Sequence, residues 1–114
     1  MLTLDQLDSF GANTKTGVQR CANKEELYLR LVKMVPTNAS FKALEESINH
    51  NDLDKAFQAA HALKGVLLSL ELTPLTELVV EITDLLRNKT MMDYSNYLEK
   101  IETLRKKLED ICNN

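Results

Sequence analysis

The sequence predicts an all-α protein, and two observations support this fold class. The 114 residues include only three glycines and two prolines. A sheet protein of this length needs many tight turns, which these residue types usually supply. Along most of the chain, apolar residues also recur with the helical period of 3.6 residues. The length, with 44% apolar and 27% charged residues, fits one globular domain over residues 1–114.

The first third of the chain is expected to form short helices. Apolar spacing predicts one over residues 2–10 and another over about 14–22. Asn23, with Glu26 three residues later, resembles a capping box, which marks the start of a helix. This helix should end before Pro36, because proline and the residue before it disfavour a helical backbone.

Four longer amphipathic helices are expected after it. They cover residues 39–49, 52–71, 73–88 and 93–111. Asn51 or Asp52 caps the longest, and Thr73 followed by Pro74 opens the next. Helices joined by short connections can bury their apolar stripes only against one another. The prediction is an antiparallel four-helix bundle with one or two short additional N-terminal helices. The last stripe is needed to close the bundle, so we expect a monomer.

Charge and hydropathy argue against two classes of partner. Fourteen Lys and Arg residues face 17 Asp and Glu residues, for a net charge of −3. Nucleic-acid binders usually carry a basic excess, and the one dense basic cluster, residues 105–107, is balanced by neighbouring acids. No apolar stretch approaches the ~20 residues that span a bilayer, and no secretory signal is visible. We therefore expect a cytoplasmic protein that binds neither nucleic acid nor membrane.

The residues with chemical potential lie in the middle of the longest helix. At 100° per residue, His61 falls on the border between the apolar stripe and solvent. Gln58, Gly65 and Leu68 lie on the same side, and Lys64 lies between this side and the core. A glycine inside a helix costs about 1 kcal/mol relative to alanine, so Gly65 indicates that access to the imidazole matters. Lys64 can reach a negative group attached to the ring.

Each of these residues also has an ordinary structural interpretation. A single histidine on a helix is usually a surface or packed residue, and an interior glycine sometimes only allows close helix packing. The second histidine, His50, lies at a helix end among asparagines and fits a structural role. The coincidence of His61, Lys64 and Gly65 on one face favours a functional site.

The stretch Ala60-His61-Ala62-Leu63-Lys64-Gly65 resembles the His-x-Leu-Lys-Gly motif of histidine-containing phosphotransfer (HPt) domains of two-component phosphorelays. The resemblance extends over roughly residues 10–110. The chain departs from it at Val66 and Leu67, where small or hydroxyl residues are common. It also departs at Glu71, where a second glycine is frequent, and near Thr83, where Glu or Gln is frequent.

The resemblance implies a function for each site residue. His61 would accept a phosphoryl group from the aspartate of a receiver domain, or from a sensor or hybrid histidine kinase. It would then pass the group to a response-regulator aspartate. Lys64 would stabilise the phosphoryl group, and Gly65, Gln58 and Leu68 would provide access and docking. We expect no cofactor or metal on this chain, with magnesium on the partner receiver domain, and no ATP site, so the protein would be a carrier and not an enzyme.

Two other functions remain open. One is a non-catalytic helical interaction bundle that has lost phosphotransfer, although the presence of His61 together with Lys64 argues against it. The other is the dimerisation region of a histidine kinase, an enzyme class in which the histidine lies on a two-helix hairpin. Five or more helices that close on themselves disfavour that hairpin.

Overall fold

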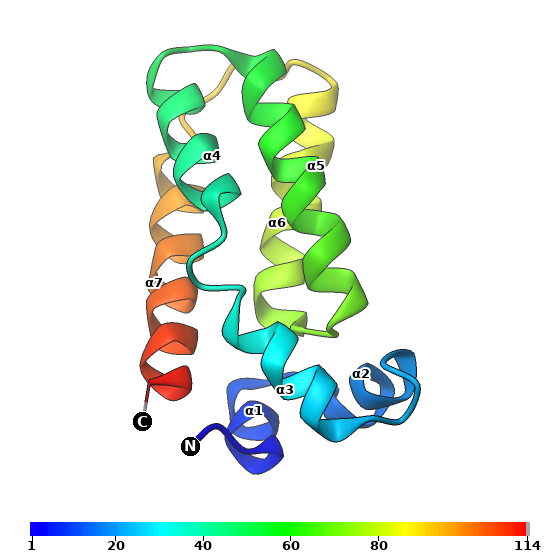
Figure 1. Ribbon diagram of the computed structural model, residues 1–114. Helices are drawn as coiled ribbons and strands as arrows, with labels where there is room; N and C mark the ends of the chain where they lie inside the picture. Colours follow the sequence, from blue (N-terminus) through cyan, green and yellow to red (C-terminus); the bar gives the residue numbers. More distant parts are fainter. Residues whose placement is uncertain (114) are drawn as a thin grey trace.

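The computed structural model describes residues 1–113, which form seven helices and no strand (Figure 1). The helices are α1 (Leu4–Phe10), α2 (Thr14–Arg20), α3 (Glu25–Lys33), α4 (Ala39–Asn49), α5 (Leu53–Ser69), α6 (Thr73–Arg87) and α7 (Ser95–Cys112). The predicted all-α helical bundle is confirmed. Within the described residues, three short helices precede the four longer ones. They correspond to the three segments expected before Pro36, although the bundle prediction counted only one or two additional helices. No helix among them is long and apolar enough to cross a bilayer.

The helices α4 to α7 run alternately up and down beside one another (Figure 1). Helix α5 packs against both α4 and α6, and α6 packs against α7. The Asp52 carboxylate accepts a hydrogen bond from the Lys55 amide at 3.0 Å, so α5 is capped where the sequence predicts. The inward stripe of α5 is buried completely and consists of Ala56, Ala60, Leu63 and Leu67. Burial of each leucine contributes roughly 1.5–3 kcal/mol, which fixes the outward face of this helix.

The capping of the short helices differs from the prediction at Asn23. Its φ is +61°, in the left-handed region, and its amide donates to the Val18 carbonyl at 2.9 Å. Asn23 therefore terminates α2, and α3 begins at Glu25 without a side-chain cap. The capping box that the structure does contain pairs Thr3 with Gln6. Helix α6 begins at Thr73 itself, one residue earlier than a Thr73 cap would place it.

The helices α1, α2 and α3 gather at one end of the bundle (Figure 1). Leu2 and Leu7 are buried there, and α1 contacts α7. The Asn13 amide donates to the Glu71 carbonyl at 3.0 Å, which ties the α1–α2 connection to the α5–α6 turn. The N-terminal helices thus close the end of the bundle toward which α5 runs.

Tyr28 of α3 lies at the centre of this end. Its side chain is fully buried, and its hydroxyl donates to the Leu70 carbonyl at 2.9 Å. Gly17 packs flat against the ring, so that any Cβ at position 17 would overlap it. Burial, reinforced by the negative charges that Cys21, Asp8 and Glu71 can carry, raises the pKa of Tyr28 to about 12, from the usual 10.0.

This shift predicts a loss of stability at alkaline pH. The unfolded chain releases the Tyr28 proton near pH 10, but the folded chain holds it until about pH 12. The contribution of the protonated Tyr28 to the free energy of unfolding is therefore complete below pH 10. It falls by about 1.4 kcal/mol per pH unit between pH 10 and pH 12. Tyr28→Phe should lack this dependence and should cost about 1 kcal/mol at neutral pH, because the Leu70 carbonyl loses its donor. Urea unfolding of both proteins at pH 8, 10 and 11 tests this, and parallel pH profiles would contradict it.

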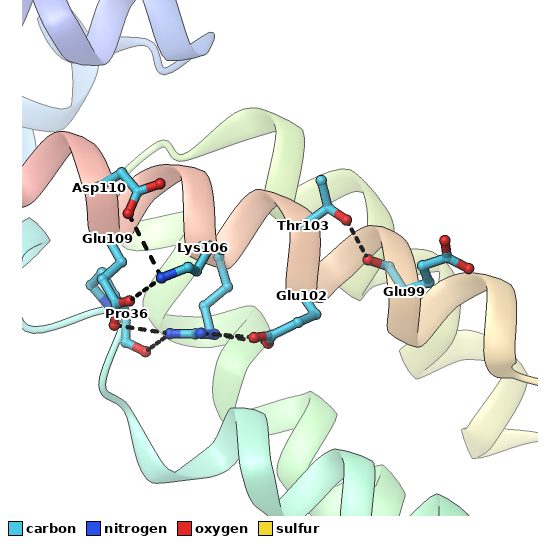
Figure 2. Close-up of polar contacts among 8 residues, drawn as sticks. Pro36, Glu99, Glu102, Thr103, Lys106, Glu109 and Asp110 are labelled. Atoms are coloured by element: carbon cyan, nitrogen blue, oxygen red, sulfur yellow. Dashed lines mark hydrogen bonds and ion pairs between the residues drawn. The ribbon is translucent and has the colours of Figure 1, made fainter.

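Arg105 fastens the α3–α4 connection to α7. Its guanidinium donates to the Pro36 carbonyl at 3.0 Å, to both carboxylate oxygens of Glu102 at 2.7 and 2.8 Å, and to Glu109 at 3.3 Å. Figure 2 shows these acceptors converging from the connection and from α7. The hydrogen bond from Arg105 also lowers the pKa of the Glu102 carboxyl. This basic residue is therefore a structural clamp between two elements, which orients the α3 end relative to the bundle.

Candidate functional site

His61 lies in the middle of α5 with an exposed imidazole. Within residues 1–113, no side chain or backbone group forms a hydrogen bond with either ring nitrogen at the lengths usual for such bonds. Its ring contact is with Phe57, one turn earlier on the same helix. The two ring centroids are 5.7 Å apart and the planes differ by 16°, which is a stacked arrangement. The imidazole therefore lies on a rigid helix and is accessible to a partner molecule.

The next turn of α5 carries Lys64 and Gly65. Lys64 is half-buried, and among the described residues no carboxylate lies within 4.0 Å of its ammonium group. Gly65 is exposed, and a Cβ built on it would meet no atom within 4 Å. The glycine therefore serves no close helix packing in the described structure, so that structural interpretation of Gly65 is wrong. A cation and an open space thus lie on the helical turn that follows the histidine.

Gln58 and Leu68 complete this face of α5. Both side chains are exposed, and 45% of Leu68 is accessible. Gln58, His61, Gly65 and Leu68 are spaced three or four residues apart, and Lys64 follows His61 by three, so the five residues line one side of the helix over about three turns. The structure thus brings together all the site residues that the sequence singles out.

A groove adjoins this face, and sequence reasoning missed it. Its volume is about 930 Å³, and it is bordered by Ala62 and Gly65 of α5 and by Leu31 and Met34 at the end of α3. Leu31 is 36% exposed and Met34 63% exposed, which is high for apolar side chains of this size. Leu31 fits the apolar stripe of its helix, so its sequence position predicts burial. In the structure Leu31 instead lines the groove and is partly exposed.

The positions that depart from the HPt motif have clear structural roles. Leu67 belongs to the core, and Val66 is half-buried beside it. Glu71 has a φ of +55°, the left-handed conformation that glycine adopts without strain. Thr83 is fully buried, and its hydroxyl donates to the Val79 carbonyl. No hydrogen bond joins Thr83 to the imidazole of His61 in the described residues, where the ring contact of His61 is with Phe57.

A model of one protein family, described as the Hpt domain, matches residues 25–114. The chain belongs to this family. The matched region includes α3 to α7 and the whole of the face around His61, whereas α1 and α2 precede it. Searches of curated proteins and of solved structures found no match.

Hpt domains are phosphocarriers of two-component phosphorelays, and they interact with receiver domains and kinases. Phosphotransfer in signal transduction is therefore the class of function to which this helical bundle belongs. Within residues 1–113, no group of three or more His, Cys, Asp or Glu side chains is placed to hold a metal ion.

Proposed function

We propose that His61 is the phosphoacceptor of this Hpt domain. It takes a phosphoryl group from the aspartyl phosphate of a receiver domain and passes it to the aspartate of a response regulator. The observation that carries the proposal is the combination of an exposed imidazole, a Lys64 without an ion-pair partner among residues 1–113 and the open space at Gly65 on one helix face. The other histidine has a different environment, because Nδ1 of His50 lies 2.7 Å from the Glu46 carbonyl.

The transfer needs only groups that the two proteins provide. A neutral imidazole offers a lone pair on one ring nitrogen. As the N–P bond forms, the bond between phosphorus and the aspartate oxygen breaks, and the carboxylate leaves with the electron pair. Charge spreads over the three equatorial oxygens in the transition state. The Lys64 ammonium stabilises this charge electrostatically. The reverse step returns the group to a second aspartate.

The partner supplies the other half of the active site. A receiver domain that approaches His61 occupies the open space beside Gly65, and it contacts Leu68 and Gln58 at the edge of the interface. The groove lined by Leu31 and Met34 offers apolar surface for burial beside the reacting atoms. Magnesium enters with the receiver domain, whose carboxylates suit this ion.

Incubation with phosphorylated receiver domains tests the proposal. The expected product carries one added phosphate that is acid-labile and alkali-stable, and fragmentation mass spectrometry should locate it on His61. Absence of label from every receiver, with the helices shown to be intact by circular dichroism, would overturn the proposal in favour of a non-catalytic interaction bundle.

Lys64→Gln should slow transfer from the phosphorylated receiver by roughly tenfold. A charge pair a few ångströms apart near a protein surface contributes on the order of 1–4 kcal/mol before screening, and 1.4 kcal/mol corresponds to a factor of ten. Lys64→Arg keeps the charge and is the matched control. Rapid-quench measurements at low and high salt should show a smaller salt effect in Lys64→Gln than in the wild type. Equal rates for the two variants would contradict the electrostatic role.

A further inference from the structure

A row of three side chains links α5 to α6 at the site. The rings of His61 and Phe57 stack at 5.7 Å, and the guanidinium carbon of Arg87 lies 5.6 Å from the centroid of the Phe57 ring. Arg87 is in the last turn of α6 and is itself held by Asp84, whose carboxylate accepts its Nη1–H at 2.8 Å. Because α6 runs antiparallel to α5, its end lies beside the turn that carries Phe57 (Figure 1).

These contacts restrict the motion of an otherwise unrestrained ring. An exposed histidine without hydrogen bonds samples several rotamers. Restricting the side chain to one of them costs conformational entropy. A stacked aromatic pair is attractive beyond the burial of its surface, and a cation over the ring face adds a further electrostatic attraction. Phe57 is half-buried and packs against the core, so its own ring has little freedom. Because Phe57 is held by the core, its stacking contact restricts the orientation of the His61 imidazole.

We propose that Phe57 is a positioning residue for phosphotransfer, and that Arg87 holds Phe57 in place. The inference rests on the proposed function of His61 as phosphoacceptor. Phosphoryl transfer requires the attacking nitrogen to lie in line with the bond that breaks, and a misplacement of about 1 Å can cost 100-fold in rate. A stack that preselects one ring orientation raises the fraction of encounters that react, without adding to the affinity for the receiver.

Proton NMR of the unphosphorylated protein tests the stack itself. The Phe57 ring current should shift the imidazole C–H resonances of His61 away from those of a free histidine. Phe57→Leu keeps apolar volume but removes the ring, so these resonances should move toward free values. Phe57→Tyr keeps the ring and should preserve the shifts. Unchanged resonances in Phe57→Leu would overturn the inference.

Transfer kinetics test the positioning role. At saturating phosphorylated receiver, Phe57→Leu should lower the maximal transfer rate three- to tenfold, with the half-saturating receiver concentration unchanged. Phe57→Tyr should restore the wild-type rate, and Arg87→Gln should show a smaller decrease. A change in the half-saturating concentration alone would identify Phe57 as a docking residue and overturn the inference.

Measurements on the wild-type protein distinguish a failure of the proposed function of His61 from a failure of the positioning role of Phe57. If the wild type accepts no phosphate, the proposed function of His61 fails, while the NMR comparison still reports on the stack. If the wild type is phosphorylated and Phe57→Leu reacts at the same rate, the positioning role fails and the function of His61 stands. Thermal unfolding of each variant, followed by circular dichroism, confirms that the compared proteins are folded.

Discussion

His61→Gln is expected to abolish phosphoryl acceptance from a phosphorylated receiver domain. Glutamine has no nucleophilic nitrogen, so no N–P bond can form. The fold should be unaffected, because the imidazole is exposed and, within the described residues, has Phe57 as its only ring contact. Exposed substitutions of this kind usually change stability by no more than about 0.5 kcal/mol. Intact mass measured after incubation with the phosphorylated receiver checks the loss of label.

The chain contains only two histidines, which provides a matched control. His50→Gln removes the other imidazole, whose Nδ1 lies 2.7 Å from the Glu46 carbonyl at the end of α4. This variant should be labelled like the wild type. Label that persists in His61→Gln but disappears in His50→Gln would reassign the phosphoacceptor.

Gly65→Gln is expected to reduce transfer from the receiver by roughly 100-fold while making the free protein more stable. The space beside Gly65 is empty in the structure, so the new side chain meets no neighbour through its Cβ. Glutamine is also a better helix former than glycine, which should stabilise α5 by about 0.5–1 kcal/mol. The same side chain occupies the path of the approaching receiver and displaces the reacting aspartate from His61. Urea unfolding and transfer kinetics should therefore change in opposite directions.

A small phosphodonor distinguishes access from chemistry at this position. Phosphoramidate needs no protein surface, so it should phosphorylate Gly65→Gln as fast as the wild type. Gly65→Ala, with a single methyl group in the open space, should give an intermediate effect with the receiver. An unchanged rate with the receiver refutes the access argument. An equal loss with phosphoramidate would show that Gly65 acts on the imidazole itself.

Features set by local periodicity could be predicted from the sequence. The stripe of Ala56, Leu63 and Leu67 repeats at helical spacing, so it identifies the buried side of α5 before any packing is known. The same arithmetic places His61 and Gly65 on the outward side, because residues of one helix keep their angular relation in any fold. The match to the Hpt family agrees with the resemblance of residues 60–65 to the HPt motif.

Features set by contacts between distant segments could not be predicted. Arg105 looks like part of a solvated basic cluster, yet it binds the Pro36 carbonyl, 69 residues away in the sequence. Leu31 follows an apolar stripe, but it lines the groove beside α5 and is partly exposed. Asn23 is a residue type that often caps a helix start, but its backbone amide instead closes the end of the preceding helix by donating to the Val18 carbonyl. Each outcome depends on tertiary geometry that local pattern does not contain.

The placement of a single acceptor ring on one helix face has a kinetic consequence for the proposed carrier. A donor and an acceptor receiver both need the space above Gly65, so they cannot occupy it together. Phosphoryl flow through the protein then proceeds in two separate encounters, as in a ping-pong cycle. Spent donor that remains bound competes with the acceptor, so the throughput of the relay depends on how quickly the first partner dissociates.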